Sequence, residues 1–207
     1  MAVDIGTSFA APLVSQFIIR LIDAFPDAKP NMIKALLYHF AQKRNIPGSL
    51  TNPHHFFTGF GEPHIGNAIF SQPDTLSYLY EGILDKKEYE YVGFHIPEIF
   101  KNRSSTKLKV KITLVFDPDV DAENDFEYSM AQVAATLFKA QDGIFKEIHI
   151  DTANKYNLAW NPILQFEKEF SRNFSCGYWE LRLWLFTRGK LIEKEAKLCR
   201  CCGNYRR

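Results

Sequence analysis

The 207-residue sequence has no long hydrophobic run and no excess of charge of one sign. A membrane span needs about twenty uninterrupted apolar residues, and Gln16, Arg20 and Asp23 break the first apolar run. With 25 basic and 24 acidic residues the formal net charge is +1, so electrostatics favour neither nucleic acid nor an anionic membrane as partner. Asp4 stands where a secretory signal would be basic. We expect a cytoplasmic protein without a membrane or nucleic-acid partner.

The sequence also has few cysteines, and their spacing forms no recognisable framework. Cys176 stands alone, and Cys199, Cys201 and Cys202 crowd into the last nine residues. Zinc sites use pairs of ligands separated by a loop, and adjacent cysteines are poorly placed to bridge one another. We expect no metal, no cofactor and no disulfide. The tail over 190–207 is expected to be disordered or non-native, as an interrupted reading frame would produce.

Apolar residues, at 46% of the sequence, are numerous enough for a sizeable core. The clearest strand is 107–117, where Leu108 to Phe116 alternate with a polar face that includes Lys111 and Thr113. Residues 125–140 fit a helix or a strand. Three further segments are expected to be extended: 89–96, 144–151 and 178–187. Such alternating strands are typical of an antiparallel sandwich.

A short motif with nucleophile character lies near the start of the sequence. Gly6, Thr7, Ser8 and Pro12 open a stretch with apolar residues at helical spacing over 9–25. Gly6 lets a backbone or substrate approach closely. Ser8 is expected to cap the helix, so that its amide and the helix dipole face an incoming carbonyl oxygen. Pro12 is expected in the first turn, where its missing amide hydrogen is not needed. The alternative is that Ser8 only caps a core helix.

Two more patterns follow this motif. A second helix is expected from Asn31, as its cap, to about Gln42. A glycine-rich turn comes next, Gly59-Phe60-Gly61-Glu62-Pro63. In this order, the serine motif, the helix and the turn resemble the end of the catalytic domain of subtilisin-like serine peptidases, the subtilases, over about residues 4–70.

The resemblance implies a serine endopeptidase that hydrolyses polypeptide substrates through an acyl-enzyme. Ser8 would be the nucleophile and its backbone amide part of the oxyanion hole, with Gly6, Thr7 and Pro12 supporting the motif. In that family the aspartate, the histidine and the oxyanion asparagine precede the serine, and residues 1–5 cannot hold them. All six histidines follow Ser8: His39, His54, His55, His64, His95 and His149.

We therefore expect a carboxyl-terminal portion of such a peptidase, a fragment that is inactive alone. An amino-terminal half or a separate subunit would supply the missing groups. In subtilisin, removing the histidine lowers turnover about a millionfold. The expected fold class is α/β: the end of a parallel-sheet domain over 1–70, then a β-sandwich-like region over 71–189. That region is similar to the sandwich appended to larger bacterial subtilases. Residues 1–70 are expected to be poorly stable alone.

Other functions fit individual features of the sequence. The serine motif is one residue away from an α/β-hydrolase elbow, with His149 as base and Asp117, Asp119 or Asp121 as acid, although that fold needs several strands before its serine. A non-catalytic remnant or protein-interaction module built on the sandwich is a second alternative. The carboxylates of 117–125, including Glu123 and Asp125, are expected to form a solvated turn rather than a calcium site. His54, His55 and His64 are expected in surface loops, and Trp160, Trp179 and Trp184 in the core.

Overall fold

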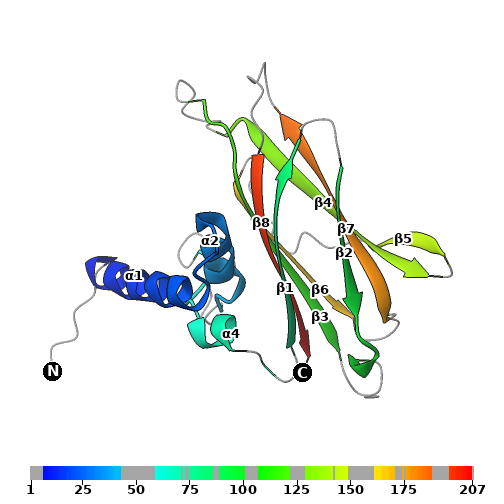
Figure 1. Cartoon of the computed structure of the whole chain (residues 1–207), viewed down its shortest axis with the longest axis horizontal. Coiled ribbons are helices and arrows are strands. Elements are labelled where there is room, and N and C mark those ends of the chain that lie inside the picture. The colour runs from blue at the N-terminus through cyan, green and yellow to red at the C-terminus, as the bar shows by residue number, and fades with distance from the viewer. Residues whose placement is uncertain are drawn as a thin grey trace, which may run out of the picture.

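The computed structural model describes residues 7–42, 59–70, 72, 75–85, 89–100, 107–121, 129–141, 143–148, 161–170, 174 and 176–187, and the backbone of 196–206. These residues form a helical layer and two β-sheets, arranged one behind the other (Figure 1). Among the described helices, none is long and apolar enough to cross a membrane.

The helical layer contains the two helices expected from apolar periodicity and a third, shorter one. These are α1 (Thr7–Ala24), α2 (Pro30–His39) and α4 (Ile65–Ile69). Lys29, not Asn31, precedes α2 as its cap, so the expected cap was wrong. Pro30 suits the first helical position because no intrahelical bond needs its amide. The Asn31 side chain is used elsewhere, since its Nδ2 donates to Asp117 Oδ2 at 2.8 Å.

Eight strands and one 3₁₀ turn follow the helices. The strands are β1 (Thr75–Leu84), β2 (Glu90–Ile96), β3 (Leu108–Asp117), β4 (Ala131–Gln141), β5 (Ile144–Ile148), β6 (Ile163–Phe170), β7 (Gly177–Thr187) and β8 (Ala196–Arg206), and the turn η1 is Glu98–Phe100. Strands β2, β3, β5 and β7 match the expected segments, and residues 131–140 of the ambiguous segment 125–140 are a strand. Strands β1 and β6 were not expected.

The strands form two four-stranded sheets, ordered β1-β8-β3-β6 and β2-β7-β4-β5. Every pairing between described strands is antiparallel. The antiparallel part of the expected fold class is therefore confirmed, and the parallel sheet is not. Among the described residues, the subtilase-like segment contributes helices and no strand of a sheet.

The main core lies between the two sheets. Leu181 and Leu183 of β7 are fully buried in it, and so are Ile112 and Leu114 of β3 in the opposite sheet. Trp179 is the largest of the fully enclosed side chains, as expected for a core tryptophan. Burying each such side chain contributes about 1.5 to 3 kcal/mol, so this core is the main source of stability of the sandwich.

The second face of β3 is covered as well, by helix α2. Leu36 of α2 packs with Val115 of β3 in a second cluster of buried side chains. Lys111 and Thr113, predicted on the polar face of this strand, are 7% and 0% exposed. The polar side of this strand therefore forms an interface with the helix.

Strand β8 differs from the expectation of a tail outside the fold. Residues 196–206 lie between β1 and β3 and pair with both. Every residue other than proline has a backbone amide and a carbonyl group that need hydrogen-bond partners, whatever its side chain. A segment in which apolar and polar residues alternate only weakly can therefore still complete a sheet. The non-native origin of 190–207 stays a prediction.

The glycine-rich turn returns the chain to the end of α2. Gly59 and Gly61 have φ values of 54° and 109°, a region that residues with a Cβ rarely adopt. Gln42 and Glu62 then exchange two backbone hydrogen bonds of 2.9 Å. The Tyr38 and Phe60 rings lie 4.9 Å apart. These contacts hold the glycine-rich turn against the end of α2.

Candidate functional site

Ser8 lies in the first turn of α1 and is exposed. The helix begins at Thr7, one residue before Ser8, so Ser8 is not its cap as predicted. Thr7 is exposed too, and Gly6 lies outside the described residues. The first turn of α1 points away from the sheets (Figure 1).

Pro12 is the sixth residue of α1 rather than part of its first turn. An amide at this position would bond to the carbonyl four residues earlier, which is that of Ser8. The proline has no such hydrogen, so the helical ladder leaves the Ser8 carbonyl without this bond. The prediction that Pro12 lies in the first turn, where its amide hydrogen is not needed, was wrong.

The electrostatic field at the start of α1 favours negative charge. The first amides of a helix have no intrahelical partner, and the first turn of α1 contains no acidic side chain. The positive end of the helix dipole is therefore not neutralised within that turn. A carbonyl oxygen that gains negative charge in a reaction at Ser8 would be stabilised here.

Serine chemistry also needs a base, and the described histidines do not provide one. His39 is fully buried, with its Nδ1 3.0 Å from Thr113 Oγ1. His64 precedes α4, and His95 lies on β2 in the second sheet. Within the described part of the chain, no hydrogen bond joins any of these three to Ser8. His54, His55 and His149 lie outside the described residues.

His39 instead belongs to a buried polar junction between α2 and the first sheet. Gln165 Nε2 donates to Thr113 Oγ1 at 3.2 Å and to the Tyr38 carbonyl at 3.1 Å. Lys111 Nζ donates to the His39 carbonyl. Burial, reinforced by the charges of Lys111 and Lys109, holds the pKa of His39 well below its ordinary value. The junction thus keeps His39 neutral and ties the helix to the sandwich.

Sequence reasoning missed this junction. Its only signal was that Thr113 and Gln165 are short or uncharged polar residues in strands, where exposed positions often carry charges. Alternation by itself does not separate a face that meets water from one that meets a polar helix surface.

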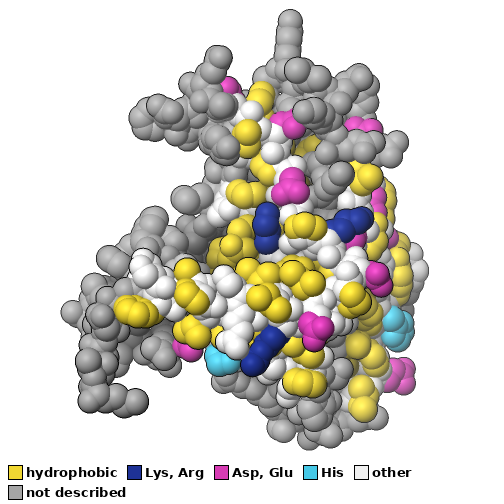
Figure 2. Space-filling view, turned by 60° about the vertical axis from the view of Figure 1, so that its left-hand side comes forward, with side chains coloured by type: hydrophobic (Ala, Val, Ile, Leu, Met, Phe, Trp, Pro, Cys, Tyr) yellow, Lys and Arg dark blue, Asp and Glu magenta, His cyan; other side chains and the backbone are white. Residues whose placement is uncertain are grey.

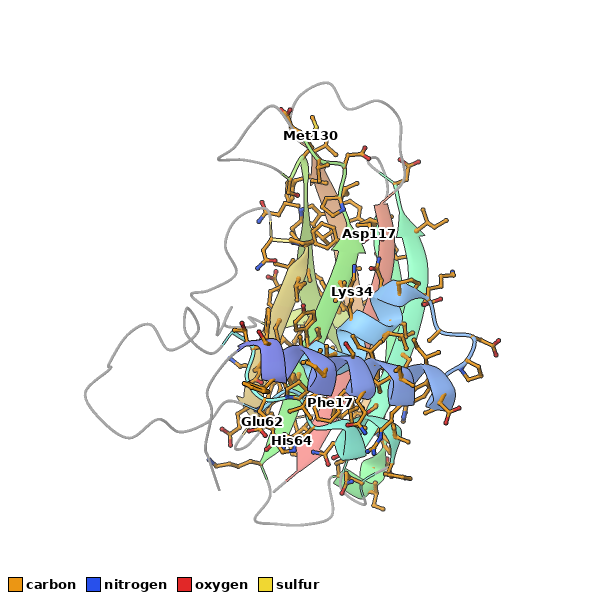
Figure 3. All side chains as sticks on the ribbon, turned by 90° about the vertical axis from the view of Figure 1, so that its left-hand side faces the viewer. Phe17, Lys34, Glu62, His64, Asp117 and Met130 are labelled. Carbon is orange, nitrogen blue, oxygen red and sulfur yellow. The ribbon has the colours of Figure 1, made fainter. Side chains whose placement is uncertain are left out.

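Of the acidic residues expected in a solvated turn, the structure describes Asp117, Asp119 and Asp121. Asp117 lies at the end of β3, 4.0 Å from Lys34 Nζ across the boundary with α2 (Figure 3). Among the described residues, no three histidine, cysteine, aspartate or glutamate side chains could hold a metal ion. Asp119 and Asp121 lie beyond β3, and Glu123 and Asp125 fall outside the described residues.

Two of the three tryptophans are described. Trp179 is buried in the core, as predicted. Trp184 is only half-buried and contacts Phe186, with ring centres 5.8 Å apart. It faces away from the core, so its prediction as a core residue was wrong. Trp160 lies outside the described residues.

Comparison with known proteins gives a family match at the serine. Residues 5–61 match the model of the subtilase family. This stretch is similar to subtilases. It contains the serine motif, α1, α2 and the first glycines of the turn, and the sandwich lies outside it.

Two other similarities extend further along the chain. An uncharacterized protein, y4bN, of Sinorhizobium fredii is 28% identical over 129 residues, which cover 58% of this chain and 29% of that protein. The chain thus spans less than a third of this relative. The infectious bursal disease virus VP2 subviral particle has a TM-score of 0.33 and 10% identity, over 65% of this chain and 32% of that one. Similarity at this level assigns neither a fold family nor a function.

Proposed function

We propose that this chain is the carboxyl-terminal portion of a subtilase-like serine endopeptidase and that Ser8 is its nucleophile. The observation that carries the proposal is the exposed serine in the first turn of α1, inside the stretch that matches the subtilase family. Residues 1–70 would be the end of the catalytic domain. Gly6, Thr7 and Pro12 would shape the backbone around the nucleophile.

In the proposed reaction, Ser8 Oγ attacks the carbonyl carbon of a peptide bond. A base takes the hydroxyl proton and gives it to the leaving amine, and water then hydrolyses the acyl-enzyme. The first-turn amides of α1 stabilise the oxyanion. The base, its aspartate and the second oxyanion donor would come from an amino-terminal half or a separate subunit, since His39 is committed to Thr113.

Helix α1 carries the surface on which such a partner would pack. A helix with apolar side chains on all sides is usually buried, yet Phe9, Leu13, Ile19 and Ile22 are 59%, 55%, 65% and 49% exposed. Figure 2 looks onto this side of the molecule and shows hydrophobic side chains gathered over the helical layer. Only Leu21 of α1 is fully buried. An added layer over α1 would cover the rest and bring a base to Ser8.

A fluorophosphonate probe, which labels only an activated serine, tests the proposal. The purified chain should label far more slowly than an intact serine peptidase. Addition of a half encoded by an upstream open frame, with Asp-Ser/Thr-Gly and His-Gly-Thr segments, should restore labelling. Ser8→Ala should abolish that labelling. Ser15→Ala is the matched control, because Ser15 lies on the same helix and donates to the Ala11 carbonyl at 3.0 Å.

The two parts of the proposal fail in different ways. Rapid labelling of Ser8 in the chain alone would show that no second component is needed. Failure to label in the reconstituted complex would show that Ser8 is not the nucleophile. A stop codon directly before Met1 would favour the alternative function, a non-catalytic interaction module. The exposed apolar side chains of α1 suit that alternative as well, because they mark a surface for protein binding.

A further inference from the structure

The outer face of the second sheet, on the side away from the helices, is covered with aromatic side chains. In β7, residues alternate between this face and the core, so Arg182 and Trp184 face outward while Leu181 and Leu183 are buried. Arg182 lies opposite Tyr91 of the neighbouring strand β2. We call the following set the aromatic face: Tyr89, Tyr91, Phe138, Phe145, Tyr178, Trp184 and Phe186. Figure 1 shows the helices on the opposite side of the molecule.

The rings of the aromatic face contact one another along and across the strands. Tyr89 lies 6.3 Å from Tyr91 and 6.1 Å from Trp184, measured between ring centres. Trp184 in turn contacts Phe186. These are tilted or edge-to-face arrangements, which aromatic pairs prefer. The rings therefore form a connected layer rather than scattered exposed side chains.

Arg182 lies at the centre of this layer. Its guanidinium carbon is 4.0 Å from the centre of the Phe138 ring, 5.4 Å from that of Tyr91 and 5.5 Å from that of Phe145. Its Nε donates to Glu180 Oε1 at 2.7 Å. Three rings and one carboxylate thus hold the arginine in place, and its charge is balanced within the face.

Tyr178 extends the layer across β2. A Cβ placed on Gly93 would collide with the Tyr178 ring, so the ring lies directly over the glycine backbone. The Tyr178 ring centre is also 6.1 Å from that of Phe145 on β5. All four strands of the sheet are therefore bridged on this face by side chains of β2, β7, β4 and β5.

Much of this aromatic layer is uncovered. Its five most exposed rings are 41–57% exposed, and because one buried aromatic side chain covers about 200 Å², these five leave roughly 500 Å² uncovered. That is at the upper end of what a monomer exposes as one patch. No described segment packs on this face, whereas the outer face of the first sheet is covered by α2.

We propose that the aromatic face is the interface of a symmetric dimer, in which two copies of this chain pack sheet against sheet. Interfaces are enriched in Tyr, Trp, Phe and Arg, and this face carries seven aromatic side chains and Arg182, with Glu180 and, opposite Phe138 on β5, Glu147 as its carboxylates among the described strand residues. A standard interface buries about 800 Å² per partner. The exposed rings supply most of that area.

The charges of the face suit a second copy better than another ligand. In a twofold interface a residue i meets j of the partner while j meets i. Arg182 and Glu180 are adjacent and opposite in charge, so a twofold axis beside them brings the arginine of each copy to the glutamate of the other. A single neutralised cation gives nucleic acid little to bind. The two sheets would pack about 10 Å apart, as in other β-sandwich contacts.

Sedimentation velocity of the full chain over a wide concentration range tests the dimer. The wild-type chain should form dimers and no larger species, because a twofold interface closes at two copies. Phe186→Ser and Tyr91→Ser should each raise the dissociation constant about tenfold or more. Phe9→Ser is the matched control: Phe9 is 59% exposed on α1, outside the aromatic face, and its loss should leave the dissociation constant unchanged.

Hydrogen exchange provides a readout that needs no variant to fold. Amides of β2 and β5 in the wild-type chain should be better protected at high than at low concentration, and those of α1 should not change. A monomer at every concentration overturns the proposal, whatever else the face binds. So does an association that Phe9→Ser removes and Phe186→Ser leaves intact.

Discussion

His39 shows at the scale of one residue how the helical layer depends on pH. Its pKa is lowered in the folded chain by burial and by Lys111 and Lys109. The unfolded chain, with an ordinary histidine pKa of about 6.5, therefore binds more protons than the folded chain at acidic pH. The stability that neutral His39 provides is present above that pH and is lost as the pH falls below it.

We expect the free energy of unfolding to fall by up to about 1.4 kcal/mol per pH unit below pH 6.5 from this residue alone. Urea unfolding of the chain at a series of pH values measures this slope. His39→Gln should flatten it, whereas His64→Gln, at an exposed histidine, should leave it unchanged. Equal slopes in all three proteins would show that His39 does not carry the effect.

Two leucines provide a matched pair in the helical layer. Leu36 of α2 is 1% exposed and packs against β3, whereas Leu13 of α1 is 55% exposed. Leu36→Ala should lower the free energy of unfolding by about 2 to 5 kcal/mol, because it leaves a cavity. Leu13→Ala should change it by less than about 0.5 kcal/mol. Urea unfolding compares the two, and similar losses would mean that α1 is already covered in solution.

At the scale of elements, α1 and β3 represent two extremes of burial. Helix α1 has one fully buried side chain, and β3 is buried on both faces. Local stability follows buried apolar contact. In the purified chain we expect weak hydrogen-exchange protection over residues 9–25 and strong protection in β3. Strong protection across α1 at low protein concentration would contradict the proposal that this helix awaits a covering layer.

The elements that could be predicted from the sequence are those with a strict pattern. Alternation holds over residues 108–114 of β3 and 179–183 of β7, and the apolar spacing of α1 is regular, so their types and approximate bounds follow directly. Strand β6 mixes Gln165 and charged residues into its pattern, and Gln165 meets α2 rather than water. Such an interface depends on residues far apart in sequence, and no local pattern reports it.

The candidate site was predictable to the same limited degree. Ser8 stands out because its motif is local, and its exposure at the start of a helix agrees with the motif. The commitment of His39 to Thr113 joins residues 74 positions apart. The aromatic face draws on four strands whose order in the sheet is not their order in the sequence, so it became visible only with the register.

At the scale of the whole molecule, the first sheet depends on its inner strand β8. It lies between β1 and β3 and pairs with each along its length. Without it, β1 would have no described neighbour and β3 would keep only β6. A pair of strands is marginal in water, and a sheet of three or more is needed for independent stability.

Removal of residues 196–207 should therefore abolish cooperative unfolding and the near-ultraviolet circular dichroism of the buried Trp179. Removal of residues 1–24 is the comparison, because it deletes more residues but only the peripheral helix α1. That variant should keep both signals, since the sandwich core contains no side chain of α1. If instead the chain without 196–207 keeps a cooperative transition, β8 is not an integral strand, and the prediction of a non-native tail gains support. Loss of both signals on removing α1 would show that the sandwich depends on the peptidase-like segment, and the two parts would then be one folding unit.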